Sequence, residues 1–438
     1  MTRSSTTSEL THKAKKACLK LAAADTDTKN RLLFAIGENI RQRSRDILEQ
    51  NALDVEAAKQ AVENGELSKP LLNRLVLSED KIKQLSVYLE EVAKLEDPVG
   101  RRQFGTKLAD GLELERVTCP IGLLAVIFES RPEVVIQVTA LCLKSGNGAI
   151  LKGGMEAAHS NRILFSVIDD TLKGFDLSNA VNLIETREDV AGLLRCDDDI
   201  DLIIPRGSNE FVKYIQDNTR IPVLGHSSGI CHLYIDCSFD ASTLVPVVLD
   251  SKLDYPSACN ALETLLVHRA AAVKVLPKVL PELIKNDVLC LGCSETVQIA
   301  KSAGIILEAA QESDWSTEYT DLILSIRVVD SIDDAIDHIN TYGSHHTDSI
   351  LTNIEENASR FLDEVDSACV FHNTSTRFSD GYVFGLGAEV GISTNKTHSR
   401  GPVGLDGLII YKYKLRGSGQ LRASFSGPEA EKFLHQPI

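Results

Sequence analysis

The sequence predicts an α/β protein with parallel sheets that carry helices on both faces. Residues 7–96 have apolar side chains at three- and four-residue spacing, as amphipathic helices do. From about residue 111 to residue 384, short apolar runs alternate with amphipathic stretches, which is the strand–helix order of a parallel sheet. The length of 438 residues suits two or three domains.

The elements follow from the local pattern. LELERV (112–117) alternates like a half-buried strand, whereas IGLLAVIF (121–128) is continuously apolar, like a strand buried on both faces. A switch to a second unit is expected near residues 231–240. Strands are also predicted in NGAILKGG (147–154), AVNLIE (180–185), IDLIIP (200–205), VLG (223–225), ALETLLVH (261–268) and GLIIYKYKL (407–415), the last of which could pair with LELERV or with a neighbouring subunit.

The composition excludes several classes of protein. The net charge of −16 opposes general binding to nucleic acid or to an anionic membrane. The N-terminal residues are polar, and no apolar run is long enough to span a bilayer. The ten cysteines are scattered singly, which indicates reduced thiols, and we expect a cytoplasmic protein.

Three motifs have ordinary explanations. GLGAEVG (385–391) departs from the dinucleotide-binding spacing and lacks a strand–turn–helix unit, so a tight loop is expected. Cys290 and Cys293 form a CxxC pair without the second pair that a zinc site needs, and two core thiols are favoured over a redox pair. Adjacent His345 and His346 would point to opposite faces of a strand, so no metal is expected.

Cys259, in DYPSACNALETLLV, is the candidate nucleophile. Proline and small residues precede it, which leaves room for a substrate and lets backbone N–H groups face a developing oxyanion. A reactive cysteine also needs its thiolate favoured by positive charge or by backbone dipoles. A buried core thiol is the alternative that these residues leave open.

Long segments of the chain resemble the aldehyde dehydrogenase superfamily and, within it, the gamma-glutamyl phosphate reductases. The resemblance covers nearly the whole chain and follows the order of the family. Its strongest segments are residues 126–154, 201–215, 222–236, 253–268, 317–350 and 384–417.

The resemblance implies an aldehyde dehydrogenase-like fold of two parallel-sheet α/β domains and a small β oligomerisation extension. Residues 1–235 are expected to form the NADP-binding domain, with residues 111–118 in the extension. Residues 236–384 are expected to form the catalytic domain, and residues 385–438 to return to the cofactor domain and end in an oligomerisation strand. The implied reaction, the second step of proline biosynthesis, reduces L-glutamyl 5-phosphate with NADPH to L-glutamate 5-semialdehyde and phosphate.

Residue roles carry over by position. Cys259 matches the nucleophile that would form a thioacyl-enzyme. Lys152 matches the lysine at the adenosine ribose, Gly207 and Ser208 match the pair near the pyrophosphate, and Glu318 matches the glutamate that holds the nicotinamide ribose. Met155 stands where many NAD-preferring relatives carry a glutamate; without that carboxylate, repulsion of a 2′-phosphate is removed, which favours NADP.

The chain departs from the superfamily pattern at the reacting group. His226 stands where hydrolytic relatives have a water-activating glutamate, which suits an enzyme that must protect its thioester from water. Ser130 stands near the position of the oxyanion asparagine, so the donors stay open among the Cys259 N–H, Ser130 and Asn260. Arg131, Arg377 and Arg400 lie in the matching loops and are candidates for the substrate's phosphate and carboxylate, with surface ion pairs as the alternative.

Two other functions are weighed against the reductase. A hydrolytic aldehyde dehydrogenase predicts NADP reduction without phosphate, and a non-catalytic partner that kept the fold is opposed by the presence of Cys259. The substrate's acyl phosphate is labile, so a transient contact with glutamate 5-kinase is expected. The extension predicts a homodimer or a homotetramer.

Overall fold

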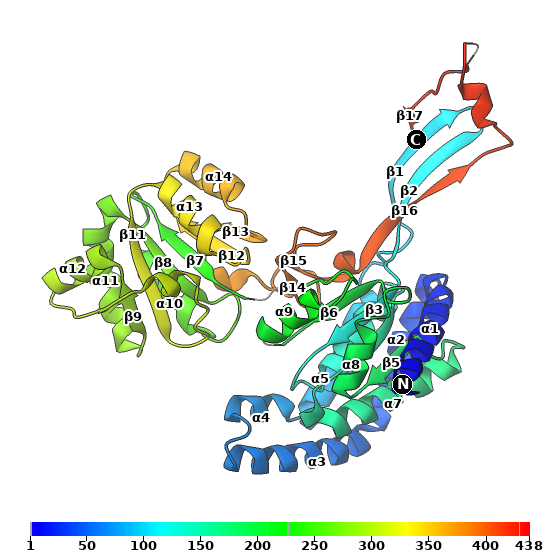
Figure 1. Ribbon diagram of the computed structural model, residues 1–438, viewed down its shortest axis with the longest axis horizontal. Helices are drawn as coiled ribbons and strands as arrows, with labels where there is room; N and C mark the ends of the chain where they lie inside the picture. The colour runs from blue at the N-terminus through cyan, green and yellow to red at the C-terminus, as the bar shows by residue number, and fades with distance from the viewer. Residues whose placement is uncertain (1, 208, 226–227, 429) are drawn as a thin grey trace.

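The computed structural model describes residues 2–207, 209–225, 228–428 and 430–438. They form a helix-rich unit around a four-stranded sheet, a second unit around a seven-stranded sheet, and a narrow β-extension that projects from the first unit (Figure 1). Parallel sheets with helices confirm the predicted α/β class.

Helices open the described chain, as the spacing of apolar residues predicts. They are α1 (Thr2–Ala22), α2 (Thr26–Gln42), α3 (Ser44–Glu63), α4 (Lys69–Leu75) and α5 (Glu79–Lys94). The side chains of Asp25 and Ser78 cap α2 and α5, because each accepts the backbone N–H of the residue three positions later, Thr28 and Lys81. Leu32, Leu33 and Ile36 of α2 are fully buried, so this helix packs its apolar face into the first unit's core.

The first unit's sheet has the strand order β5-β4-β3-β6, and all its pairs are parallel. Its strands are β3 (Leu123–Ile127), β4 (Gly148–Lys152), β5 (Val181–Ile184) and β6 (Leu202–Pro205), and its helices are α6 (Val134–Lys144), α7 (Ala158–Gly174), α8 (Arg187–Leu193) and α9 (Asn209–Asp217). Leu124 and Val126 of β3 pack in one core, whereas Leu123, Ala125 and Ile127 pack in another. Successive side chains of a strand point to opposite faces, so the continuous apolar run covers both faces.

The second unit's sheet has the order β10-β9-β11-β8-β7-β12-β13, again with all pairs parallel. Its strands are β7 (Cys231–Ile235), β8 (Leu262–His268), β9 (Leu289–Gly292), β10 (Glu308–Ala309), β11 (Ile323–Val329), β12 (Thr347–Leu351) and β13 (Cys369–His372). Its helices are α10 (Leu244–Leu253), α11 (Arg269–Lys285), α12 (Ser294–Ser302), α13 (Ile332–Tyr342) and α14 (Glu355–Glu364).

The position of β7 shifts the border between the two sheets. The strand pairs with β8 and β12, so the second sheet begins at Cys231 and not at residue 236, where the boundary was predicted. An apolar run identifies a buried strand but does not say which sheet it joins. The predicted strand 223–225 is reduced to a single bridge between Val223 and Ile203.

The extension is an antiparallel sheet of order β16-β2-β1-β17. It consists of β1 (Arg102–Ala109), β2 (Leu112–Pro120), β16 (Ile409–Arg416) and β17 (Gln436–Pro437). The pairing of β16 with β2 confirms that GLIIYKYKL meets LELERV within the chain. The outer edge of β16 has no further strand beside it among the described residues.

The segment between β13 and β16 returns to the first unit. Ala388, Val390, Leu405 and Leu408 pack in the core of the four-stranded-sheet unit. The segment holds β14 (Ile392–Ser393) and β15 (Gly401–Pro402). Over the whole described chain, short 3-10 helices lie at Met155–Ala157, Glu312–Ser316, Thr376–Phe378, Leu405–Leu408 and Arg422–Phe425. The return brings Glu389, Gly391 and Ile392 beside the loop that holds Cys259, because they line one cavity with it.

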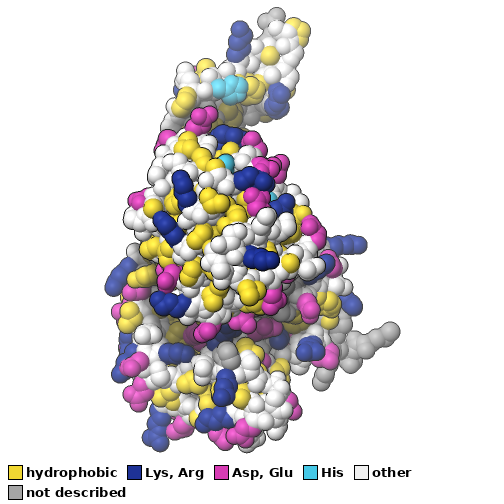
Figure 2. Space-filling view, turned by 90° about the vertical axis from the view of Figure 1, so that its left-hand side faces the viewer, with side chains coloured by type: hydrophobic (Ala, Val, Ile, Leu, Met, Phe, Trp, Pro, Cys, Tyr) yellow, Lys and Arg dark blue, Asp and Glu magenta, His cyan; other side chains and the backbone are white. Residues whose placement is uncertain are grey.

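The surface carries both signs of charge. Figure 2 shows basic and acidic side chains interspersed over the face toward the viewer, with the extension standing clear at the top. Within the described ranges, no helix combines the length and the apolar character needed to cross a bilayer.

Candidate active site

Cys259 lies in the loop between α10 and β8, and its backbone is held in close contact. A Cβ at Gly229 would lie 2.0 Å from the Cys259 carbonyl oxygen, so only glycine allows these two segments to approach. The amide of Asn260 donates to the carbonyl oxygens of Arg377 at 3.3 Å and Ser379 at 2.9 Å. The loop is therefore fixed from both sides.

The Cys259 side chain lines a small cavity of about 190 Å³ between the two units. The four-stranded-sheet unit contributes Pro205, Arg206, Gly207 and Val212, and the returning segment contributes Glu389, Gly391, Ile392 and Val403. We call this space the thiol cavity. Its position gives the sulfur access to groups that belong to both units.

The charges around the thiol cavity disfavour the thiolate. Burial raises the pKa of Cys259 to about 12, and the carboxylates of Glu318 and Glu389 add to this effect, while its own backbone N–H and Arg206 oppose it. Burial also raises the pKa of Glu389, whose carboxylate accepts the Gly381 N–H at 2.9 Å. In this arrangement the sulfur is a thiol, and activation requires added positive charge or a proton acceptor.

A larger cavity of about 840 Å³ lies beside the thiol cavity. Arg206 and Glu389 line both spaces, and Arg131 lines only the larger one. The remaining wall is formed largely by α5 and by residues 380–389, with Lys81, Lys83 and Glu91 from the helix and Asp380 and Tyr382 from the loop. This space, the α5 cavity, is large enough for an amino acid with a phosphate.

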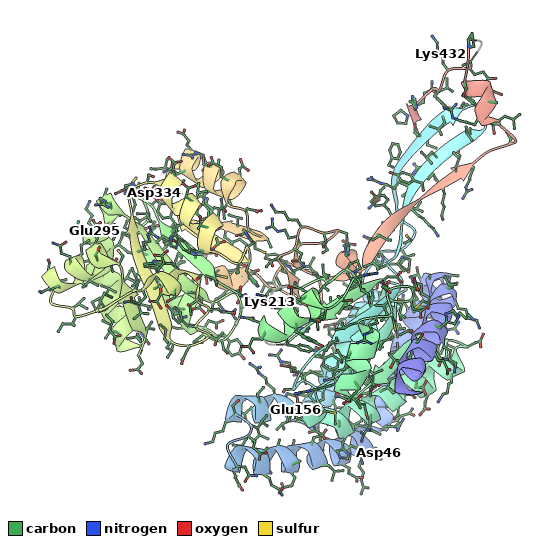
Figure 3. The ribbon with its side chains drawn as sticks, viewed as in Figure 1. Asp46, Glu156, Lys213, Glu295, Asp334 and Lys432 are labelled. Atoms are coloured by element: carbon green, nitrogen blue, oxygen red, sulfur yellow. The ribbon has the colours of Figure 1, made fainter. Side chains whose placement is uncertain are left out.

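A third cavity, of about 770 Å³, lies in the four-stranded-sheet unit and holds Lys152 and Arg187. Glu156, which Figure 3 places between α4 and α9, accepts the backbone N–H of Ser130 at 2.7 Å and its hydroxyl at 2.6 Å. Ser130 has a φ of 44°, in the left-handed region, so this bond holds a strained backbone. Ser130 therefore lines this nucleotide-sized cavity and not the thiol cavity.

Glu318 connects the two units near the sulfur. Its carboxylate accepts the side-chain N–H of Asn209, at the start of α9, at 2.8 Å. Gly207, two residues before the first residue of α9, lines the thiol cavity. The other predicted pyrophosphate residue, Ser208, and the predicted replacement of the water-activating glutamate, His226, lie outside the described residues.

The candidate arginines separate into two kinds. The Arg377 guanidinium bonds Asp254 at 3.1 Å, and Arg400 bonds the Asp366 carboxylate and backbone carbonyl, each at 3.0 Å. Neither lines the thiol cavity or the α5 cavity. Of the three arginines, only Arg131 lines the α5 cavity, which adjoins the thiol cavity.

Sequence reasoning missed Arg206, Arg187 and Glu389. Arg206 directly precedes Gly207 in the segment IIPRGS, and the end of a buried parallel strand is where ligand-binding residues gather, so a signal was present. Glu389 lies inside GLGAEVG, whose glycines 385, 387 and 391 all have positive φ, which confirms the predicted loop. Its place beside Cys259 depends on the return of the chain to the first unit.

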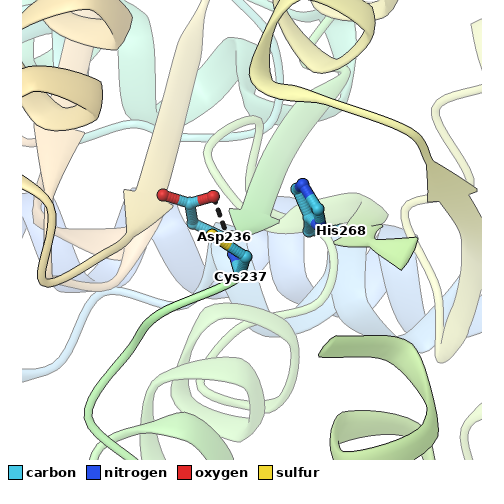
Figure 4. Close-up of side chains that lie close together, drawn as sticks. All are labelled: Asp236, Cys237 and His268. Atoms are coloured by element: carbon cyan, nitrogen blue, oxygen red, sulfur yellow. Dashed lines mark hydrogen bonds between the residues drawn. The ribbon is translucent and has the colours of Figure 1, made fainter. Parts of the chain in front are cut away.

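Asp236, Cys237 and His268 have donor atoms within 4.8 Å of one another (Figure 4). The Asp236 carboxylate already accepts hydrogen bonds from Thr352, Asn357 and the Cys237 N–H, each at 2.7 Å. The His268 ring accepts the Ala270 N–H at 3.1 Å. These hydrogen bonds explain why the three side chains lie close together at the ends of β7 and β8.

Curated relatives of this chain include many gamma-glutamyl phosphate reductases. A gamma-glutamyl phosphate reductase from Acetivibrio thermocellus is 51% identical, with 98% of each chain covered. One from Methanosarcina mazei is 50% identical, covering 97% of this chain and 96% of its own. No family model matches the chain.

Solved structures agree. The crystal structure of gamma-glutamyl phosphate reductase from Thermotoga maritima has a TM-score of 0.90 and 40% identity, covering 94% of this chain and 99% of its own. An acetylating aldehyde dehydrogenase from Geobacillus thermoglucosidasius, 16% identical over 95% of this chain and 98% of its own, has a TM-score of 0.64 and shares the fold. The identities and near-complete coverage show that this chain belongs to the gamma-glutamyl phosphate reductase family, with the fold of the aldehyde dehydrogenases.

Proposed function

We propose that this enzyme reduces L-glutamyl 5-phosphate to L-glutamate 5-semialdehyde with NADPH, releasing phosphate, through a thioester on Cys259. This is the second step of proline biosynthesis from glutamate. The observation that carries the proposal is the position of Cys259. It lies where its own unit meets the unit that holds the nucleotide-sized cavity, and the α5 cavity beside it is lined by Arg131 and Arg206. Family membership supplies the substrate.

The chemistry starts at the sulfur. The Cys259 thiolate attacks the acyl carbon, a sulfur–carbon bond forms, and the carbon–oxygen bond to phosphate breaks, so that phosphate leaves with the electron pair. NADPH, when bound, would supply the hydride for the acyl carbon; the carbon–sulfur bond then breaks, the aldehyde forms, and the electron pair returns to the Cys259 sulfur. The Cys259 N–H stays our candidate oxyanion donor, because the structure gives the Ser130 hydroxyl and the Asn260 amide other acceptors.

The third cavity fits a phosphorylated adenosine. Lys152 and Arg187 supply two cations for a 2′-phosphate, and Met155, half-exposed at 58%, brings no carboxylate of its own. Glu129 and Glu156 also line the cavity, and both act on the pKa of Lys152 by favouring its charged form against burial. Gly207 lines the thiol cavity, and Glu318, which accepts a hydrogen bond from Asn209 of α9, is the candidate for the nicotinamide ribose.

Cofactor choice gives a direct test of this placement. Replacing Lys152 and Arg187 together by Gln should raise KM for NADPH by on the order of tenfold or more, since a charged hydrogen bond contributes about 1.5–3 kcal/mol. KM for NADH should change far less, because NADH lacks the 2′-phosphate. An equal rise for both cofactors would contradict the assignment.

Protection of the thioester rests on the shape of the thiol cavity. Val212, Leu224 and Val403 give it apolar walls. Glu389 is the carboxylate among its described lining residues; burial raises its pKa, and it already accepts the Gly381 N–H at 2.9 Å. Wild-type enzyme should therefore turn over NADP and the semialdehyde steadily only when phosphate is present; steady turnover without phosphate would favour the hydrolytic alternative.

The Cys259→Ala variant tests the nucleophile. It should abolish phosphate-dependent reduction of NADP by glutamate 5-semialdehyde while leaving NADPH binding, measured by fluorescence titration, intact. Cys237→Ala is the matched control, because Cys237 is exposed and does not line the thiol cavity. Full activity in Cys259→Ala would contradict the mechanism.

Assembly and supply of substrate complete the proposal. We expect a cytoplasmic homodimer or homotetramer that forms through the extension, where Ile410, Tyr411, Tyr413 and Leu415 of β16 are exposed. Charged substitutions at Tyr413 and Leu415 should shift sedimentation toward a monomer. A transient contact with glutamate 5-kinase would deliver the labile acyl phosphate, and an inactive competitor reductase that leaves the coupled flux unchanged would count against it.

A further inference from the structure

Arg206 stands in the wall shared by the thiol cavity and the α5 cavity. It follows β6 directly, and its backbone N–H donates to the Ile127 carbonyl at 2.6 Å, which fixes the base of the side chain to the central strand β3. It is half-buried, and both Cys259 and Glu389 act on its charge. The base of the Arg206 side chain is thus fixed in the wall of the cavity that Cys259 lines.

The charge of Arg206 lacks a close partner among the residues that the structure describes. Its guanidinium makes no hydrogen bond with them and no ion pair within 4.0 Å, in contrast to Arg377 and Arg400. Burial lowers the pKa of Arg206, Glu389 opposes this effect, and Arg131 adds to it. A desolvated guanidinium costs free energy unless an anion is bound, so the site favours the arrival of an anion.

The shape of the site indicates which anion arrives. The guanidinium faces the cavity in which the substrate's acyl carbon must meet Cys259, so the substrate group nearest to Arg206 is the one attached to that carbon. In an acyl phosphate this group is the phosphate. A planar guanidinium suits two phosphate oxygens at once.

We propose that Arg206 binds the phosphate of the acyl phosphate and stabilises it as it leaves, whereas Arg131, which lines the α5 cavity but not the thiol cavity, holds the α-carboxylate. The inference rests on the proposed function and deepens it. As sulfur bonds to the acyl carbon, the carbon–oxygen bond breaks and its electron pair goes to the phosphate, and Arg206 offsets the charge that develops there. In the reverse direction, the same side chain receives inorganic phosphate as it attacks the thioester.

The reverse reaction separates binding of phosphate from the other steps. With glutamate 5-semialdehyde and NADP held at saturation, inorganic phosphate is varied for wild type, Arg206→Gln and Arg206→Lys. Arg206→Gln should raise KM for phosphate by on the order of tenfold to a hundredfold, the loss expected for a charged hydrogen bond. Arg206→Lys, which keeps the charge but loses the planar fork, should fall between. Arg45→Gln, on a residue whose side chain is 89% exposed, is the control for arginine removal.

A second readout distinguishes a phosphate-binding role from a structural one. Without phosphate, Arg206→Gln should still produce one NADPH per chain in a single burst, because formation of the thioester from the aldehyde needs no phosphate. An unchanged KM for phosphate, or a loss of the burst in folded Arg206→Lys, would overturn the inference. If Arg206→Gln does not fold, the KM of Arg206→Lys decides. Wild-type enzyme that turns over without phosphate would instead overturn the proposed function.

Discussion

The carbonyl oxygen of Cys259 lies where a Cβ at Gly229 would have to be. The Cys231 thiol also donates to this carbonyl, at 3.3 Å, so the backbone of the nucleophile is enclosed by the segment that enters β7. Small residues around Cys259 were visible in the sequence. The glycine thirty positions upstream could not be connected with it, because only the fold brings them together.

Gly229→Ala tests this enclosure. The added methyl group would overlap the backbone of Cys259, and this clash can be relieved only if the loop moves. We expect a loss of stability of about 1–3 kcal/mol, as for overpacked cores, and a fall in kcat of at least about a hundredfold from misplacement of the sulfur. Denaturant unfolding and reverse-reaction kinetics measure the two effects. Gly174→Ala, where a Cβ meets nothing within 4 Å, is the control and should leave kcat unchanged.

The pKa of Cys259 predicts an unusual pH profile for the free enzyme. Only the thiolate reacts with iodoacetamide, and burial with two carboxylates raises the pKa of this thiol to about 12. Labelling of Cys259, followed by peptide mapping, should therefore rise about tenfold per pH unit up to about pH 10 without levelling off. Because the Glu389 carboxylate raises this pKa, Glu389→Gln should accelerate labelling. A plateau near pH 8 would contradict the account.

The candidate residues were not equally recognisable from the sequence, and the reason is physical. Residue type and neighbours make Cys259 a candidate, and the resemblance makes Lys152 one, but the partner of a charged group depends on contacts distant in sequence. Arg377 and Arg400 have ion-pair partners at positions 254 and 366. The position of Arg206 after a buried strand was visible in the sequence, but its lack of such a partner in the described chain was not.

At the scale of elements, a buried ion pair holds the helix and the strand that flank the nucleophile. Lys252 of α10 donates to Glu263 of β8 at 2.8 Å, and both side chains are fully buried. Glu263 also accepts the Thr320 N–H at 3.2 Å, next to Glu318. Burial lowers the pKa of Lys252 and raises that of Glu263, and their mutual attraction opposes both shifts.

Breaking this pair should be costly. Lys252→Met leaves a buried carboxylate without its cation, and we expect a loss of about 3–5 kcal/mol in the unfolding transition of this unit. The double variant Lys252→Met with Glu263→Gln should recover much of the loss, because no uncompensated charge then remains. Urea unfolding monitored by far-UV circular dichroism checks both. Equal stability of the single and double variants would show that the ion pair is not what joins α10 to β8.

The elements predicted best were those with continuous apolar runs. β3 and β8 are buried on both faces, so nearly every residue of the run carries the signal. Two-residue strands such as β10, β14, β15 and β17 were not predicted, because two residues show no period. The segment at Val223 forms one bridge for the same reason: its position is set by its neighbours more than by its own residues.

At the scale of the whole molecule, the reacting sulfur lies where the seven-stranded-sheet unit meets the four-stranded-sheet unit. The nucleotide-sized cavity belongs to one unit, Cys259 to the other, and the segment after β13 returns to close the thiol cavity with Glu389. The order of the units was predicted through resemblance. The return of residues 385–438 to the first unit was predicted as well, whereas the place of Glu389 beside Cys259 was not.

A rapid-quench experiment without phosphate tests the central claim most directly. Enzyme, NADP and glutamate 5-semialdehyde are mixed, NADPH is followed by absorbance, and the acid-quenched protein is mapped by mass spectrometry. We predict one NADPH per chain in a burst and a glutamyl group on the peptide that contains Cys259, which added phosphate removes. A burst that persists in Cys259→Ala, or an acyl group on another residue, would contradict the thioester on Cys259.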